Sequence, residues 1–129
     1  MKLGAISSVF QDRPLAYAAQ RMHEMGLECI EIGAGGYFPK SHCDPAALLK
    51  SKRACEAFTN TLAENELAIS AFSIHGQPLH PDAKIARAYA TDFRNACKLA
   101  GRIGVDRFTL LAGLPEAGPG DKHPNWITY

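Results

Sequence analysis

The sequence predicts a parallel α/β fold in which four strands alternate with three helices. Short apolar runs of strand length alternate with longer segments whose apolar residues recur at steps of three and four. The segments that follow the expected strands span about 7, 12, 8 and at least 18 residues, whereas the turns from helix to strand need only one or two. This order predicts parallel strands that are joined by right-handed crossovers.

The first strand is expected over residues 3–7, and the first helix begins after it. Asp12 and Pro14 supply the start, because a short acidic side chain caps free amide groups and proline has no N–H to leave unpaired in the first turn. Gly26 ends this helix, since glycine readily takes the left-handed conformation. The apolar face consists of Leu15, Ala18, Met22 and Met25.

The second strand is expected over residues 27–32, followed by a loop with the sequence GAGGYFPKSHC. Asp44 and Pro45 repeat the cap and proline, so they predict the start of a second helix, which ends near Asn65. Its apolar face consists of Leu48, Cys55, Phe58 and Leu62.

The third strand, residues 67–74, has two unlike faces. Phe72 and Ile74 are bulky and point one way, whereas Ala71, Ser73 and His75 are small or polar and point the other way. A third helix then runs from the cap at Asp82 to Gly104. Its apolar face consists of Ile85, Tyr89, Phe93, Ala96, Cys97, Ala100 and Ile103. Residues 105–111 form the fourth expected strand, and residues 112–129 are expected to form a loop.

The length of the chain predicts the first half of a (β/α)8 TIM barrel. Four strands in 129 residues give about 32 residues for each unit, so eight units would make about 256, close to the roughly 250 of such barrels. We therefore expect residues 1–129 to be a single domain and part of a longer protein; a natural half-barrel is the alternative. Alone, a half-barrel exposes two sheet edges, so we expect it to form homo-oligomers or to aggregate.

Composition excludes several classes of function. With 14 Lys and Arg against 13 Asp and Glu, the formal charge of +1 favours neither nucleic acid nor anionic membranes as partners. No apolar run reaches the roughly 18 to 20 residues that span a bilayer, and the start of the chain does not resemble a signal peptide, so the expected location is the cytoplasm. No two of the four cysteines form a C-x-x-C pair, so the sequence favours reduced, packed thiols over a disulfide framework or a zinc ribbon.

Long loops at the carboxyl ends of parallel strands build the sites of such folds, so the best candidate residues lie there. His75 directly follows the third strand in the inward-facing phase, where it would bind metal, contact a substrate hydroxyl or move a proton; the alternative is a hydrogen bond to a neighbouring loop. His80 is a candidate ligand contact; the alternative is a loop staple, that is, a residue whose hydrogen bonds stabilise the loop itself. Asp82 is better explained as a helix cap. Glu31 is either a buried structural carboxylate or a wall of the site.

Other motifs carry weaker signals. The glycines at 33–36 do not continue as a nucleotide-binding loop, because position 38 is Phe38, and they instead allow a sharp turn with Tyr37 and Phe38 over the barrel mouth. His42 and Cys43 would need Cys29 and Cys55 for a zinc site, but those two belong to a strand and to an apolar helix face, so we assign no metal ligand here. Trp126, in the stretch HPNW, is expected either to stack on a sugar ring or to pack against the rest of a barrel.

Four stretches together resemble the xylose-isomerase-like TIM barrels, and in particular the sugar phosphate isomerase/epimerase type. They are KLGAIS, LECIEIGAGGY, ISAFSIHGQPLHPD and AGRIGVDRFTLLAG, and HPNW follows the last. The resemblance covers the whole chain, but only as the amino-terminal half of such a barrel. An endonuclease subgroup of this superfamily has a zinc-binding histidine where His75 stands, but it also has a histidine near the end of the fourth strand, where this chain reads TLLAG.

The resemblance implies an isomerase or epimerase of carbohydrate metabolism that transfers a proton next to a carbonyl through an enediolate. It implies a divalent metal (Mn, Mg, Co or Zn) whose ligands come from the second half of the barrel, so the catalytic residues stay unknown. His75, with His80 and Trp126, is then expected to contact the sugar. The alternatives are a lyase or deglycosylating enzyme of the same fold acting on oxidised glycosides, and a non-catalytic half-barrel binding module.

Overall fold

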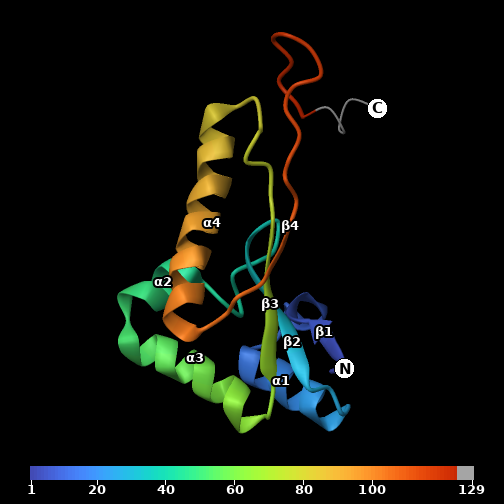
Figure 1. Ribbon diagram of the computed structural model, residues 1–129, viewed down its shortest axis with the longest axis vertical. Helices are drawn as coiled ribbons and strands as arrows, with labels where there is room; N and C mark the ends of the chain where they lie inside the picture. The colour runs from blue at the N-terminus through green and yellow to red at the C-terminus, as the bar shows by residue number, and fades with distance from the viewer. Residues whose placement is uncertain (125–129) are drawn as a thin grey trace.

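The computed structural model describes residues 1–124 and contains one sheet of four parallel strands in the order β1-β2-β3-β4 (Figure 1). The strands are β1 (Gly4–Ile6), β2 (Cys29–Gly36), β3 (Ala68–His75) and β4 (Phe108–Leu110). The helices are the 3-10 helix η1 (Ser7–Phe10), α1 (Leu15–Glu24), α2 (Pro45–Lys50), α3 (Lys52–Glu64) and α4 (Ala83–Ile103). Strands and helices alternate as in the first half of a (β/α)8 barrel, so the predicted fold class is confirmed.

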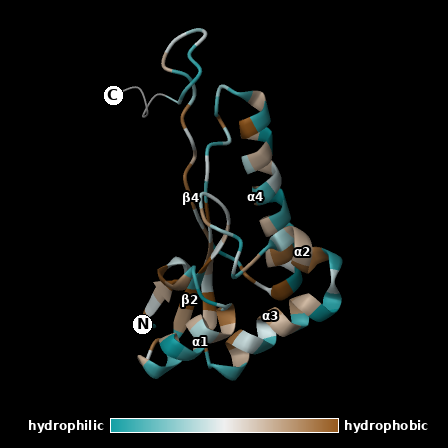
Figure 2. Ribbon diagram, turned by 180° about the vertical axis from the view of Figure 1, so that it is seen from behind, coloured by the Kyte–Doolittle hydropathy of each residue, from teal (hydrophilic) through white to brown (hydrophobic). Residues whose placement is uncertain are grey.

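One face of the sheet packs against the helices and forms the core. Ile30 and Ile32 of β2 and Phe72 of β3 are fully buried there, and Ile74 is nearly so. The helices contribute Ala19, Met22, Phe58, Leu62, Ala96, Leu99 and Ala100 to the same cluster. Figure 2 shows the hydrophilic residues of α1 and α3 along their outer sides. The period of three and four residues in each helix therefore marks the side that meets the sheet.

The opposite face of the sheet carries the residues that were predicted to point inward. Parallel pairing puts Ile6 beside Glu31 and Glu31 beside Ala71. Further along, Ser73 lies beside Thr109 of β4 and opposite a glycine of β2. Registered residues of neighbouring strands project to the same side, so the small and polar residues of β3 line the concave face of the half-barrel.

Four expected helix ends are confirmed, at Gly26, which follows α1 with a φ of 76°, and at Asp44, Asp82 and Gly104. The expected cap by Asp12 is wrong, because Pro14 is the N-cap residue of α1 and no side chain caps this helix. The carboxylate of Asp44 accepts the N–H groups of Ala46 and Ala47, and that of Asp82 accepts those of Lys84 and Ile85. These two backbone hydrogen bonds also lower the pKa of Asp82. Gly104 closes α4 with a φ of 79°. Asp82 is thus a cap, as the sequence favoured.

The second helix was expected to be continuous, and this was wrong. Ser51 has extended backbone angles and separates α2 from α3, and its Oγ accepts the N–H of Ala54 as the cap of α3. Arg102 of α4 donates to the carbonyl groups of Leu48 and Leu49 at the end of α2. A serine cap between two short helices leaves the apolar period intact, so periodicity alone does not reveal the break.

The boundaries of the strands also differ from those expected. The run Gly33–Gly36 was predicted as loop, but β2 continues to Gly36 with an irregularity in its pairing to β3. Gly35 and Gly36 have φ values of 128° and 71°, which only glycine adopts easily. The turn η1 after β1 was not predicted. β4 is shorter than residues 105–111.

An apolar groove of about 310 Å³ lies between α4 and the carboxyl ends of β3 and β4. Tyr89 and Phe93 line it from the helix, and Leu110, Leu111 and Ala112 line it from the end of the sheet. Among residues 1–124, no helix combines the length and the apolar character needed to cross a bilayer.

Candidate functional site

The candidate site lies at the carboxyl ends of β2 and β3, on the concave face of the sheet. The His75 imidazole is half-buried, and its Nε2 lies 3.5 Å from the hydroxyl oxygen of Ser73, two residues earlier on the same face. The ring of Phe38 packs against it with a distance of 5.1 Å between ring centroids. His75 therefore stands where the sequence predicted it, at the carboxyl end of β3 and at the mouth of the half-barrel.

Glycines let the chain fold back over this end of the sheet. A Cβ atom at Gly33 would lie 3.0 Å from the Cβ of Phe38, and one at Gly36 would lie 2.1 Å from the carbonyl oxygen of His75. The N–H of Tyr37 donates to that same carbonyl at 2.6 Å. The irregular end of β2 thus directs Phe38 onto the concave face, as bulges next to functional sites commonly do.

The prediction that Tyr37 and Phe38 both cover the mouth is correct for Phe38 only. Tyr37 points to the helical side, where its ring meets the edge of the Tyr89 ring of α4 at 5.5 Å. Burial is the main cause that raises the pKa of Tyr89, and the nearby Tyr37 is the next largest. Adjacent residues at the end of a strand face opposite sides, which explains why one aromatic ring covers the site and its neighbour does not.

Side chains join the loops that follow β1 and β2. The Ser7 hydroxyl accepts the N–H of Gly33 at 3.0 Å, and this hydrogen bond is buried. The Ser41 hydroxyl donates to the carbonyl of Gln11 at 3.1 Å, and the ring nitrogen Nε2 of His42 lies 2.7 Å from the carbonyl of Arg13. His42 is thus a structural residue that holds the first two loops together.

The loops that follow β3 and β4 are joined in the same way. Gln77 is buried, and its Oε1 accepts the N–H of Leu114 at 2.9 Å. The ends of all four strands are therefore cross-connected, in pairs, by polar side chains. These contacts hold the rim of the site together in addition to the backbone pairing of the sheet.

His80 lies in the same loop as His75 but is not brought into contact with it. Its Nδ1 accepts the N–H of Asp82 at 2.9 Å, and its own N–H donates to the carbonyl of Gln77 at 3.0 Å. Both bonds organise the entry to α4, which corresponds to the loop-staple alternative. Its role as a sugar contact stays a prediction. Trp126 lies outside the described residues.

Glu31 lines a shallow hollow of about 370 Å³ on the concave face, together with Ile6, Cys29 and Ser70. Its side chain is half-buried and has no hydrogen-bond partner among residues 1–124. This environment fits a wall of the site better than a buried structural carboxylate.

Residues 1–124 contain no group of three His, Cys, Asp or Glu side chains placed to hold a metal ion. His42 is engaged with a backbone carbonyl, and Cys43 and Cys55 are buried next to the core. The described part of the chain therefore does not, by itself, fit the divalent metal that the resemblance implies.

The thiol of Cys43 is expected to be unreactive in the folded protein. Burial, followed by the charge of Asp44, raises its pKa from 9.0 to about 12, so at pH 8 it holds about a thousandfold less thiolate than an ordinary thiol. Cys97 is exposed on α4. Alkylation by iodoacetamide at pH 8, followed by mass spectrometry, should modify Cys97 first and Cys43 only after unfolding. Cys97→Ser is the control, and equal rates for Cys43 and Cys97 would contradict this expectation.

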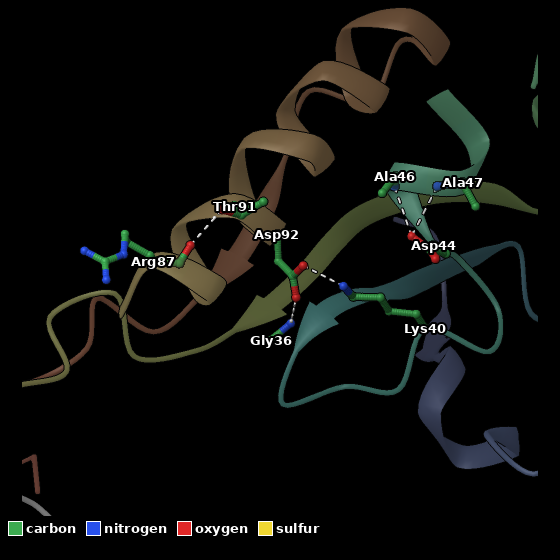
Figure 3. Close-up of polar contacts among 8 residues, drawn as sticks. All are labelled: Gly36, Lys40, Asp44, Ala46, Ala47, Arg87, Thr91 and Asp92. Atoms are coloured by element: carbon green, nitrogen blue, oxygen red, sulfur yellow. Dashed lines mark hydrogen bonds and ion pairs between the residues drawn. The ribbon is translucent and has the colours of Figure 1, made fainter. Parts of the chain in front are cut away.

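Sequence reasoning missed several residues that build the rim. Asp92, in the middle of α4, accepts the N–H of Gly36 at 3.2 Å and pairs with Lys40 (Figure 3). Ser7 and Gln77 were not singled out either. Their partners lie 26 and 37 residues away in the sequence, so no local pattern announces them.

No protein-family model matches the chain. Over all 129 residues it is 30% identical to "Uncharacterized protein YfiH" from Bacillus subtilis (strain 168) and spans 41% of that protein. Its structure is similar to a crystal structure of D-psicose 3-epimerase in the presence of D-fructose, with a TM-score of 0.56 and 12% sequence identity. The match covers 95% of this chain and 42% of the epimerase chain. The chain thus spans about two fifths of each relative, and it shares with the epimerase the fold of part of a TIM barrel.

Proposed function

We propose that this chain supplies the first four βα units of a sugar isomerase or epimerase, with His75 in the wall of its site. The likeness to the fold of an epimerase supports this proposal, as does the sequence resemblance to sugar isomerase barrels. The observation that carries it is the position of His75. Its imidazole is held at the carboxyl end of β3, on the concave face beside Ser73 and Phe38.

The three side chains match the two kinds of surface that a sugar presents. An imidazole and a hydroxyl exchange hydrogen bonds with sugar hydroxyl groups, and an aromatic ring covers the apolar C–H face of the carbon chain. Glu31 adds a carboxylate further down the same face. In the proposed reaction, a proton leaves the carbon next to a carbonyl. It returns to the neighbouring carbon in an isomerisation, or to the opposite face of the same carbon in an epimerisation.

In this proposal, His75 binds and orients a sugar hydroxyl group through Nδ1 or Nε2. Phe38 keeps water from one side of the bound sugar. A divalent metal would stabilise the negative charge of the enediolate when bound. Its ligands are assigned to parts of the whole protein other than residues 1–124. The cytoplasm is the proposed location, and a ketose or a related sugar derivative is the proposed substrate.

The proposal is tested by proton exchange with the protein expressed from its whole reading frame. The protein is incubated with ketopentoses and ketohexoses, including D-fructose, in D₂O with Mn²⁺, and NMR follows deuterium incorporation and the products. We expect incorporation next to the carbonyl of at least one sugar. We expect a loss of roughly 10²-fold or more in His75→Ala.

The matched control is His23→Ala, because His23 is a half-exposed histidine of α1 that lies beside Glu66 at a distance from the site. Absence of deuterium incorporation with every sugar would contradict the proposal. Full activity of His75→Ala would remove this residue from the site. Release of a leaving group with an unsaturated product would instead favour the lyase, and binding without exchange would favour a non-catalytic module.

A further inference from the structure

A polar contact joins α4 to the end of β2 and to the segment that carries Phe38. The Asp92 carboxylate accepts the N–H of Gly36 through Oδ2 at 3.2 Å and pairs with the Lys40 ammonium through Oδ1 (Figure 3). The Asp92 side chain is 20% exposed and that of Lys40 is 38% exposed. One carboxylate thus holds both ends of the short segment 36–40, and we call this contact the Asp92 clasp.

A second contact on the same face of α4 reinforces the clasp. Tyr89 precedes Asp92 by three residues, so the two side chains lie on one face of the helix. The ring of Tyr89 meets that of Tyr37 at 5.5 Å, and it fills the space that a Cβ at Gly76 would need. The helix therefore touches the segment at Gly36, Tyr37 and Lys40.

Phe38 is the residue in this segment that faces the other way. The backbone that leads to Phe38 is held at two further points, because Gly36 is tight against the carbonyl of His75 and the N–H of Tyr37 donates to that carbonyl. Its ring consequently lies against His75. The position of the ring thus depends on the contacts that hold the segment from the helical side as well as on its own contacts with Gly33 and His75 on the concave face.

We propose that Asp92 is a positioning residue, which acts through Gly36 and Lys40 to hold Phe38 against the His75 imidazole. That this role contributes to sugar binding rests on the proposed function. That Asp92 holds Phe38 against His75 does not rest on it. A charged acceptor suits the role, since a carboxylate forms stronger hydrogen bonds with a backbone N–H and an ammonium than a neutral group does.

The test reads the environment of His75 directly. The protein is labelled with ¹³C at the histidine Cε1 position, and the His75 signal is assigned as the one lost in His75→Gln. The ring current of Phe38 displaces this signal, and Phe38→Leu defines its position without the ring. We expect Asp92→Ala to move the signal most of the way toward that position.

Two conservative variants keep the test valid if Asp92→Ala does not fold. Asp92→Asn retains an acceptor for the Gly36 N–H, and Lys40→Met removes the cation from a side chain that is 38% exposed. Both should move the His75 signal in the same direction as Asp92→Ala, but less. Asp106→Ala is the matched control, because this exposed aspartate contacts only its neighbour Arg107 among the described ion pairs, and it should leave the signal in place.

The proposal is overturned if Phe38→Leu moves the signal whereas folded Asp92→Ala, Asp92→Asn and Lys40→Met do not. It is also overturned if Phe38→Leu leaves the signal unchanged, since the ring then does not lie against His75. The chemical shift is independent of turnover. A failure to detect deuterium incorporation into any sugar would therefore contradict the proposed function but not the role of the Asp92 clasp. An active enzyme in which the Asp92 and Lys40 variants leave the His75 chemical shift unchanged would contradict the role of the clasp but not the proposed function.

Discussion

Gly36→Ala is expected to lower the free energy of unfolding by about 3 kcal/mol. The residue has a φ of 71°, a conformation that costs a non-glycine residue free energy in itself. The new Cβ would also lie 2.1 Å from the carbonyl oxygen of His75, so the end of β2 has to move away from β3. That movement breaks the hydrogen bond from Tyr37 and shifts Phe38. Urea unfolding followed by circular dichroism measures the loss.

Gly101→Ala is the matched control for this substitution. Gly101 lies inside α4, and a Cβ there meets no atom within 4 Å. Alanine is the better helix former, so this variant should be more stable than the wild type by roughly 0.5 to 1 kcal/mol. If the two Gly→Ala substitutions change the free energy of unfolding in opposite directions, the loss at Gly36 comes from its position in the structure and not from the loss of a glycine. Unchanged stability of Gly36→Ala would mean that β2 does not end as described.

Phe72→Ala should cost about 3 to 5 kcal/mol. Phe72 is fully buried, pairs in register with Ile32 and Phe108, and meets the Phe108 ring edge to face at 6.1 Å. Its removal leaves a cavity between the sheet and the helices, because packed neighbouring side chains relax only partly into the vacated space. The midpoint and slope of urea unfolding measure the effect.

Val9→Ala is the control for the core substitution, because Val9 is 61% exposed and should change the stability by less than about 0.5 kcal/mol. If Phe72→Ala does not fold at all, Phe72→Leu retains most of the volume and should show an intermediate loss. A Phe72→Ala variant as stable as Val9→Ala would contradict the assignment of this residue to the core.

Much of the fold was predictable because its signals are local. Asp44 and Asp82 stand directly before the helices that they cap, and Gly104 directly after the one that it ends. The alternation of bulky and small residues in β3 was enough to place Phe72 in the core and His75 on the concave face. Each of these features depends on residues within a few positions of one another.

The rest of the candidate site depends on contacts between distant segments. Asp92 is a polar residue in an amphipathic helix, and nothing near it in the sequence indicates that it holds Gly36, 56 residues earlier. The break at Ser51 was hidden for a different reason, since both short helices share one apolar period. His80 looked like His75 in the sequence, but the ring of His80 accepts the backbone N–H of Asp82, whereas that of His75 lies beside Ser73 and Phe38.

The two edge strands of the sheet have three residues each, whereas the two central strands have eight. A strand that adds to either edge therefore finds few backbone groups with which to pair, and a ladder so short discriminates poorly between correct and shifted alignments. The backbone ladder at either edge of this sheet therefore contributes little selectivity for a neighbouring strand, and side-chain contacts contribute more. At the β4 end of the sheet, apolar side chains such as Phe93 and Leu110, which line the groove between α4 and the ends of β3 and β4, offer such contacts.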